Sequence, residues 1–193
     1  SSSNVAGGRL APTAGCAVVG YMTNRYPYNL DATRPVFQSS SNTYSLFTVG
    51  NPNTSCHCID FENGNSNTAI KGFDDGSSGW GNSDAWNCKF NAISIGVDAR
   101  TNSTIEYCWF NACTSTSSCL VSSGLTNIVK NCVFTSNAGV TFAAVVCEGC
   151  VFYSTAGSSG GIVTNARSLS RCLFHTITVA GSIAAKDCYS IDN

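Results

Sequence analysis

Short apolar stretches and turn-forming residues alternate along the whole chain, and one spacing of apolar positions recurs. Six segments align without gaps on the pattern apolar-x-x-Cys-x-Phe, at residues 85–90, 105–110, 129–134, 147–152, 169–174 and 185–190, with Ser190 in the place of the last Phe. A seventh, at 56–61, fits when Ile59 takes the place of the cysteine. Counted from Ile59 through the six cysteines, successive units lie 29, 20, 24, 18, 22 and 16 residues apart. A self-similar unit of this length predicts a solenoid in which each unit forms one coil.

Each unit also predicts a bend just before its cysteine. The Cys and the Phe are two positions apart and share one face of a strand, whereas the apolar residue three positions before the Cys has the opposite parity. A bend between them turns all three side chains inward. Four units carry a residue that tolerates a turn conformation at this point, namely Asn87, Asn131, Gly149 and Asp187. Tyr107 and Arg171 do not share that preference.

A second apolar stretch follows the motif in most units, at residues 93–97, 119–121, 140–142, 162–163 and 177–179. Each unit therefore has at least two short strands, and each strand pairs in parallel with its counterpart in the next unit at about 4.8 Å. The pattern predicts an all-β fold, a parallel β-helix (solenoid) of about seven coils. The coils occupy residues 46–193 with an inserted loop at 73–84, and residues 1–45 form an N-terminal cap with lead-in strands.

Two other folds, a leucine-rich repeat and a β-sandwich, are alternatives to the β-helix. A leucine-rich repeat does not fit, because its Leu-x-x-Leu-x-Leu pattern is absent. A β-sandwich does not require the same Cys-x-Phe at every step.

The repeated motif over residues 46–193 resembles the right-handed parallel β-helix superfamily, which contains pectate lyases, phage tailspikes and many viral and bacterial surface proteins. The segment 18–37 is also similar to the lead-in of phage-type β-helix proteins, through Gly-Tyr-x-Thr-x-Arg at 20–25 and Arg-Pro at 34–35. The resemblance implies a right-handed helix and a place in a virion or on an extracellular surface.

The charge balance narrows the range of partners. Charged residues make up 11% of the chain and the formal net charge is -1, whereas average soluble proteins carry roughly 25% charged residues. The ten Lys and Arg are scattered singly, so no nucleic-acid partner is expected. No apolar run approaches about 18 residues, so no membrane partner is expected either. The chain begins at Ser1 rather than at a Met, as in a processed product or a fragment.

Six of the twelve cysteines fall on the repeated position. Equivalent cysteines in adjacent coils have Cα atoms about 4.8 Å apart, but their parallel side chains hold the Cβ atoms too far apart for a disulfide. We expect a column of buried thiols beside a column of aromatic rings, which is core packing. The predicted core ladder comprises Cys88, Cys108, Cys132, Cys150, Cys172, Cys188, Phe61, Phe90, Phe110, Phe134, Phe152 and Phe174.

The other cysteines leave some pairings open. Cys113 with Cys119, and Cys16 with a distant partner, lie off the ladder and can still form disulfides. The segment 56–58, Cys-His-Cys, lacks the Cys-x2-Cys spacing of zinc sites, and on a strand His57 points away from both cysteines, so neither a metal nor another cofactor is expected. Reduced thiols favour folding in a reducing compartment, which suits a virion protein assembled in a host cytoplasm.

The acidic residues form no evident catalytic pattern. Polysaccharide lyases and hydrolases need paired carboxylates on one outer face. The candidates are not expected to stack in register over several coils; they are Asp60, Glu62, Asp74, Asp75, Asp84, Asp98 and Arg100. No nucleophile elbow, phosphate loop or dinucleotide fingerprint is present, and His175 is expected on a strand surface. No catalytic residue is assigned.

The loop at 73–84 is the best candidate for ligand binding, because long loops on a regular scaffold commonly carry function. Aromatic rings and carboxylates in and beside it can stack on a sugar and accept its hydrogen bonds. The predicted carbohydrate-binding residues are Asp74, Asp75, Trp80 and Trp86. A loop that only packs over the flank of the coil is the alternative.

These observations predict a non-enzymatic structural or adhesive, receptor-binding protein, and the resemblance implies a phage-like virion or another extracellular surface assembly. A carbohydrate-active enzyme (polysaccharide lyase or hydrolase) and a self-assembling fibre subunit are the alternatives. Solenoid ends expose unpaired strand edges. Residues 1–45 can cap one end, and the other end is expected to be covered either by further chain or by other protein subunits, in a homo-oligomer or larger assembly. Surface glycans are the other expected partners.

Overall fold

The computed structural model describes most of the repeated region and parts of the segment before it. The described ranges are 17–20, 35–39, 45–48, 53–63, 71–74, 82–99, 102–113, 120–122, 127–135, 140–142, 145–154, 162–164, 166–181 and 183–191. All regular elements in these ranges are β-strands. None of the described residues belongs to a helix long and apolar enough to cross a membrane.

The strands form three parallel sheets, each named here after its first strand. The β1 sheet contains β1 (Ala17–Val19), β4 (Ser55–His57), β7 (Asp84–Trp86), β10 (Thr104–Glu106), β13 (Ile128–Lys130), β16 (Val146–Glu148), β19 (Ser168–Ser170) and β22 (Ala184–Lys186). The β2 sheet contains β2 (Val36–Ser39), β5 (Asp60–Asn63), β8 (Lys89–Asn91), β11 (Trp109–Asn111), β14 (Val133–Thr135), β17 (Val151–Tyr153), β20 (Leu173–His175) and β23 (Tyr189–Ser190). The β3 sheet contains β3 (Phe47–Thr48), β6 (Lys71–Asp74), β9 (Ile95–Ala99), β12 (Leu120–Ser122), β15 (Val140–Phe142), β18 (Ile162–Thr164) and β21 (Thr178–Ala180).

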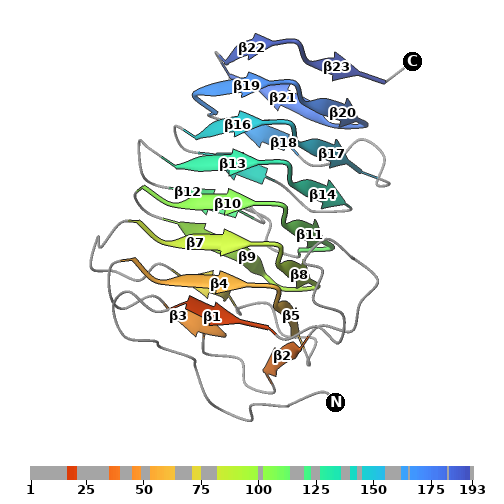
Figure 1. The fold of residues 1–193 in the computed structure, drawn as a ribbon. Coiled ribbons are helices and arrows are strands. Elements are labelled where there is room, and N and C mark those ends of the chain that lie inside the picture. Colours follow the sequence, from red (N-terminus) through yellow and green to blue (C-terminus); the bar gives the residue numbers. More distant parts are fainter. Residues whose placement is uncertain are drawn as a thin grey trace.

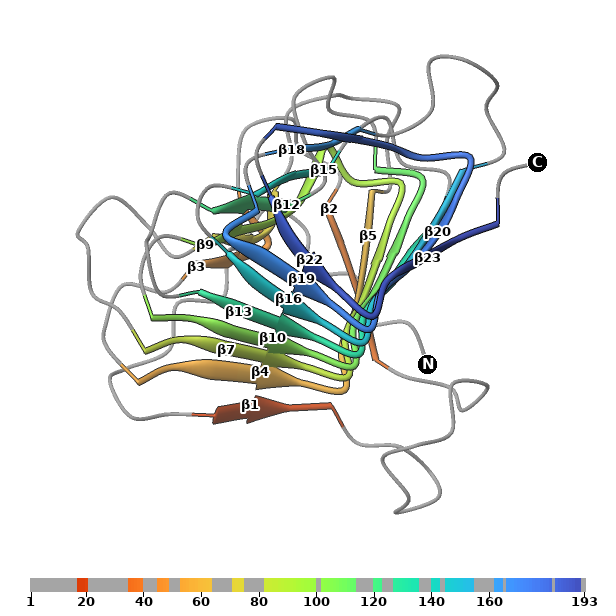
Figure 2. The same cartoon turned by 90° about the horizontal axis from the view of Figure 1, so that it is seen from above.

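The chain visits the three sheets in rotation. Neighbouring strands in each sheet are three apart in chain order and run parallel. A β1-sheet strand and the β2- and β3-sheet strands that follow it are called one winding here, and successive windings lie one above another (Figure 1). The strands β1 and β2, which precede residue 46, already pair with β4 and β5. Seen from above, the β1 and β2 sheets meet at a sharp corner (Figure 2).

The predicted bend before the repeated cysteine is this corner. One residue there has a positive φ in each motif, between 50° and 64°: Cys58, Asn87, Tyr107, Asn131, Gly149, Arg171 and Asp187. Tyr107 and Arg171 adopt it although their side chains do not favour it, at a cost on the order of 1–3 kcal/mol each. Pairing between windings compensates, since the corner amides of Tyr107 and Arg171 donate to the carbonyls of Lys130 and Lys186 at 3.1 and 3.0 Å.

The interior of the β2 sheet is a column of phenylalanine rings. In-register pairing puts each ring directly over the ring of the previous winding. The five steps from Phe61 to Phe174 have ring centroids 4.7–5.1 Å apart and planes within 16° of parallel. Six of these side chains are 5% exposed or less: Phe61, Phe90, Phe110, Phe134, Phe152 and Phe174. The strand spacing of about 4.8 Å sets the ring spacing, so the column follows from the repeat.

The corner cysteines lie beside this column and pack against the previous winding. The Sγ atoms of Cys108 and Cys132 each lie 3.5 Å from a carbonyl oxygen, that of Ala85 and that of Ile105. The ten described cysteines are thiols, nine of them buried and Cys188 half-buried. Cys16 and Cys119 lie outside the described residues.

Two pairs of sulfur atoms come into contact where the centre of a β1-sheet strand is also a cysteine. The Sγ atoms of Cys56 and Cys88 are 3.8 Å apart, and those of Cys147 and Cys172 are 3.9 Å apart. Both distances exceed the roughly 2.05 Å of a disulfide bond. Burial raises the pKa of the Cys56 thiol well above its ordinary value, so this sulfur stays protonated at neutral pH.

The phenylalanine column predicts a large loss of stability when one ring is removed. Phe134→Ala is expected to lower the free energy of unfolding by about 3–5 kcal/mol, because it leaves a cavity between two stacked neighbours. The control, Tyr153→Ala, removes an aromatic ring from the outer face of the next winding and is expected to cost about 1 kcal/mol or less. Denaturant unfolding measures both, and equal losses would contradict the buried column.

Candidate functional site

The outer face of the β1 sheet carries two columns of side chains. The middle residue of each three-residue strand faces the core, so the first and third residues face outward. The register of β4, β7 and β10 aligns Ser55, Asp84 and Thr104 in one column and His57, Trp86 and Glu106 in the other. An indole, an imidazole and two carboxylates thus share one surface.

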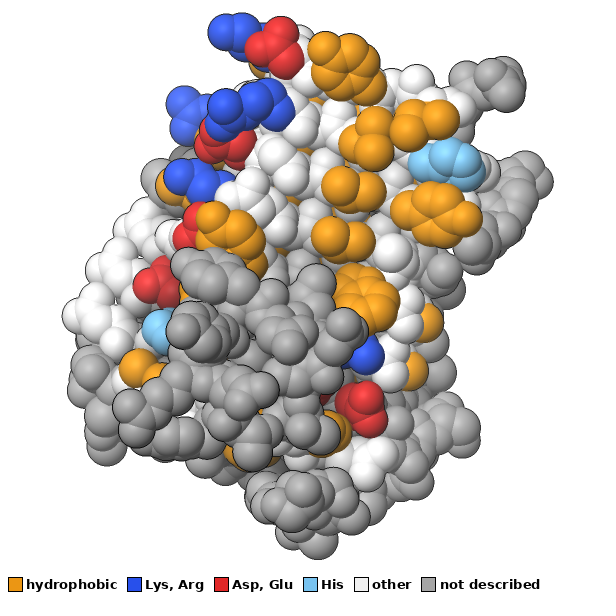
Figure 3. All heavy atoms as spheres, turned by 45° about the vertical axis from the view of Figure 1, so that its right-hand side comes forward, with side chains coloured by type: hydrophobic (Ala, Val, Ile, Leu, Met, Phe, Trp, Pro, Cys, Tyr) orange, Lys and Arg blue, Asp and Glu red, His pale blue; other side chains and the backbone are white. Residues whose placement is uncertain are grey.

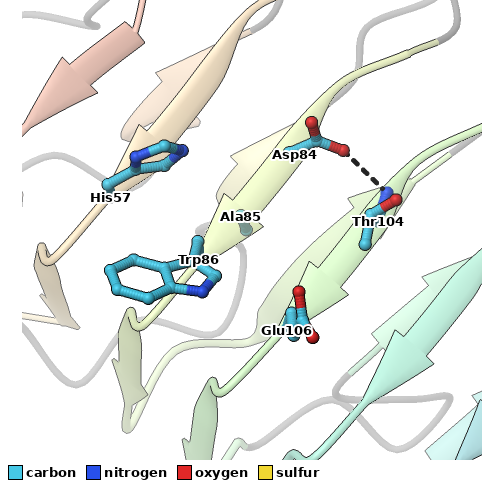
Figure 4. Close-up of a pocket in the computed structure, with 6 residues that line it drawn as sticks. All are labelled: His57, Asp84, Ala85, Trp86, Thr104 and Glu106. Atoms are coloured by element: carbon cyan, nitrogen blue, oxygen red, sulfur yellow. Dashed lines mark hydrogen bonds between the residues drawn. The ribbon is translucent and has the colours of Figure 1, made fainter. Parts of the chain in front are cut away.

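A groove of about 400 Å³ lies between these columns (Figure 4). It is lined by His57, Asp84, Ala85, Trp86, Thr104 and Glu106. Its floor is the middle of β7, where the small side chain of Ala85 is turned into the core and is 1% exposed. The backbone beneath these side chains is held by hydrogen bonds, because all three contributing strands belong to one parallel sheet.

The indole of Trp86 is held edge-on by two neighbours in the flanking windings. The ring centroid of His57 lies 5.8 Å away at 62°, and that of Tyr107 lies 6.2 Å away at 82°. These are the edge-to-face arrangements that aromatic pairs prefer. The indole orientation is therefore set before any ligand arrives.

The charges of the groove are those of two carboxylates. Burial lowers the pKa of His57 below its ordinary value, and the nearby charge of Asp84 opposes that shift. The imidazole is consequently neutral at pH 7. The carboxylate Oδ1 of Asp84 accepts a hydrogen bond from the backbone N–H of Thr104 at 3.1 Å.

Trp86 also borders a second hollow, of about 320 Å³, at the corner between the β1 and β2 sheets. The lining residues are Trp86, Asn87, Tyr107, Cys108, Trp109, Asn131 and Val133. The indole N–H of Trp109 donates to Thr135 Oγ1 at 2.7 Å, and the Nζ of Lys89 lies 4.7 Å from the centre of that ring. The two hollows adjoin at Trp86, which makes this residue the centre of the candidate site.

The structure separates the residues predicted to bind carbohydrate. Trp86 lies in the groove on the β1 sheet, whereas Asp74 ends β6 in the β3 sheet. Asp75 and Trp80 lie outside the described residues, as do most positions of the 73–84 loop. The groove residues His57, Thr104 and Glu106 were missed by sequence reasoning.

The missed residues stand at fixed positions relative to the motif and could have been found from it. His57, Trp86 and Glu106 each stand two positions before Ile59 or the motif cysteine, and Asp84 and Thr104 each stand four positions before it. Aligning the variable positions of the motif by column would have put these side chains together.

Two of the candidate carboxylates come together on adjacent strands. Asp74 and Asp98 are register partners on β6 and β9, so two acidic residues do stack on adjacent strands. The Nζ of Lys71 lies 2.5 Å from Asp98 Oδ2 and 3.4 Å from Asp74 Oδ2, and Ser45 Oγ donates to Asp74 Oδ2 at 2.6 Å. Burial opposes the charge of Lys71, but these two carboxylates outweigh it and raise its pKa. The cluster is a closed ion-pair network.

The other acidic and histidine candidates lie elsewhere. Asp60 and Glu62 are on β5 in the β2 sheet, where Glu62 Oε1 accepts from Asn91 Nδ2 at 3.5 Å. His175 stacks on Tyr153 at 4.8 Å between ring centroids. Arg100 lies outside the described residues. In the described part of the chain, no three His, Cys, Asp or Glu side chains gather in a way that could hold a metal ion.

Comparisons with protein-family models, with curated proteins and with solved structures each found no match.

The Lys71 network predicts a measurable coupling energy. A double-mutant cycle of Lys71→Ala and Asp98→Asn is expected to give a coupling of about 1–3 kcal/mol in urea unfolding, since both side chains are partly buried. The control cycle, Arg171→Ala with Glu148→Gln, removes a more exposed ion pair and is expected to give about 0.2–1 kcal/mol. A Lys71–Asp98 coupling no larger than the control would show that the network does not stabilise the β3 sheet.

Proposed function

We propose that the chain is a right-handed parallel β-helix of about seven coils and acts as a non-enzymatic structural and adhesive protein that binds a receptor through the surface around Trp86. The rotation of the chain through three parallel sheets supports the helix, and the resemblance of its motif supports the hand. The observation that carries the binding function is the indole of Trp86, fixed edge-on by its neighbours and shared by two adjoining hollows.

The rest of the outer surface fits a scaffold. Figure 3 shows apolar side chains in a column over the β2 sheet, with most of the charged side chains to the left of its upper part. The apolar column follows the register of Trp109, Val133, Val151, Leu173 and Tyr189. On the β1 sheet Glu148 bridges Lys130 and Arg171 by ion pairs. Charged side chains that pair with one another in this way support a structural role for this face.

One observation favours the alternative of a carbohydrate-active enzyme. Asp84 and Glu106 are diagonal neighbours on β7 and β10, and such neighbours lie about 7–8 Å apart. Inverting glycosidases use two carboxyl groups on one surface, one as general acid and the other as general base. Against catalysis, a general acid of this kind needs a carboxyl among apolar groups, and Asp84 is exposed.

The last described winding supports assembly with other subunits. Ala185 occupies the inward column above Leu169, which is 1% exposed, yet Ala185 is itself exposed. Tyr189 and Ile191 are 70% and 53% exposed. We propose that other protein subunits cover this end, in a homo-oligomer or larger assembly on a virion or another extracellular surface. A self-assembling fibre would use the same end.

Catalysis is tested with a panel of neutral, acidic and basic polysaccharides. The protein is expected to release no reducing ends or unsaturated products from any of them, while retaining at least one as a bound ligand. Product release that disappears in Glu106→Gln, and in Asp84→Asn, would establish the enzyme instead. Asp187→Asn, an exposed corner residue far along the solenoid, is the matched control.

Assembly is tested by light scattering against protein concentration. The average mass is expected to rise with concentration, and Ala185→Lys is expected to suppress the rise, because it puts a charge on the open inward face. Ala184→Lys is the control, since Ala184 occupies the outward column. A mass equal to one chain at every concentration, or equal effects of the two variants, would count against a subunit contact there.

A further inference from the structure

The charge of the groove restricts its ligand. Two of its six lining residues are carboxylates and none is Lys or Arg. Lys130 on β13 is the register partner of Glu106. Its Nζ lies 4.0 Å from Glu148 Oε2 on β16, the next strand away from the groove. Lys89 is over Trp109 in the β2 sheet. The hollow is thus lined by negative charge, which repels uronic and other acidic sugars and attracts a cation.

The polar groups of the groove suit a polyol better than a single cation. Two carboxylates, the Thr104 hydroxyl and a neutral imidazole come from three strands and surround the same hollow (Figure 4). Neither His57 nor Glu106 has a side-chain hydrogen bond within the part of the chain that the structure describes. An ammonium alone has three donors and cannot use so many groups spread so widely. A sugar ring presents hydroxyl donors around its edge and an apolar face.

The aromatic wall completes the fit. The apolar face of a sugar ring stacks on a fixed indole, and Trp86 is fixed by His57 and Tyr107. Because Asp84 and Glu106 flank the same hollow as this indole, a cationic substituent on the stacked ring reaches a carboxylate. The volume of about 400 Å³ also falls within the roughly 300–1,000 Å³ of small-ligand sites.

We propose that the groove binds a glycan through an amino sugar, with the sugar ring on Trp86 and its ammonium group held by Asp84 and Glu106. This inference rests on the proposed binding function and names its ligand class. It moves the carbohydrate site from the 73–84 loop to the outer face of β4, β7 and β10.

The test is isothermal titration calorimetry of the full chain at pH 6.5 with three tetrasaccharides, the tetramers of glucosamine, of N-acetylglucosamine and of galacturonic acid. Two exposed ion pairs contribute about 0.2–1 kcal/mol each, so the glucosamine tetramer is expected to bind roughly two- to thirtyfold more tightly than the acetylated one. The galacturonate is expected to bind more weakly than both. Raising the salt concentration is expected to reduce the preference, because the pairs are screened.

Variants separate the contributions. Trp86→Ala is expected to weaken both amino and acetylated tetramers about tenfold. The double variant Asp84→Asn/Glu106→Gln is expected to retain binding but to make the two affinities equal. Asp187→Asn removes one exposed negative charge outside the groove and is expected to leave the preference unchanged. Circular dichroism and the unfolding midpoint confirm that each variant is folded.

Three results would overturn the amino-sugar assignment: equal affinities of the wild-type chain for the first two tetramers, tighter binding of the galacturonate, or a lysine-rich peptide that binds as tightly and with the same dependence on Trp86. Each of these leaves the non-enzymatic binding function in place. Cleavage of a bound tetramer would instead overturn the proposed function and leave the ligand class standing.

Discussion

Parallel, in-register pairing of each strand with its counterpart one winding later is the constraint on which the rest of the structure depends. It repeats at about 4.8 Å and sets equivalent residues directly over one another. An aromatic side chain at one position therefore becomes a stack of rings 4.7–5.1 Å apart between centroids. A thiol at the neighbouring position becomes a column of sulfurs. Each column needs only one suitable residue per winding, so a short motif is enough to specify it.

The same constraint builds the outer surface. Outward positions carry no packing requirement, so their residues can differ from one winding to the next without disturbing the core. At the groove, three successive windings carry different residues at the same outward position, which puts an imidazole, an indole and a carboxylate in one column. Rigid strands hold these groups, and no loop has to close for them to come together. Binding is thus obtained by variation on a structural repeat.

Much of this arrangement can be predicted from the sequence, because the spacing of residues within the motif determines which side chains share a face of the strand. Cys88 and Phe90 are an odd number of positions from Ala85, so all three side chains can face the core only if the chain bends between Ala85 and Cys88. The bend lies at Asn87, which has a positive φ. The corners at Tyr107 and Arg171 could not be inferred from local preference, since pairing between windings overrides it. The register of Asp74 with Asp98 could not be predicted either. The spacing between motifs varies from 16 to 29 residues, so the position of the β3-sheet strand relative to the motif is not fixed by the motif.

If the motif thiols form a sheltered interior column, a thiol reagent will not reach them in the native chain, and site-resolved alkylation measures this. The native chain is treated briefly with iodoacetamide, then unfolded and treated with a heavy-isotope form of the reagent, and the peptides are measured by mass spectrometry. Among the ten cysteines that the structure describes, Cys188 is expected to carry the first label, and the other nine are expected to carry the second. First-label modification of Cys88 or Cys132 in the native chain, or their recovery in disulfides, would contradict the account.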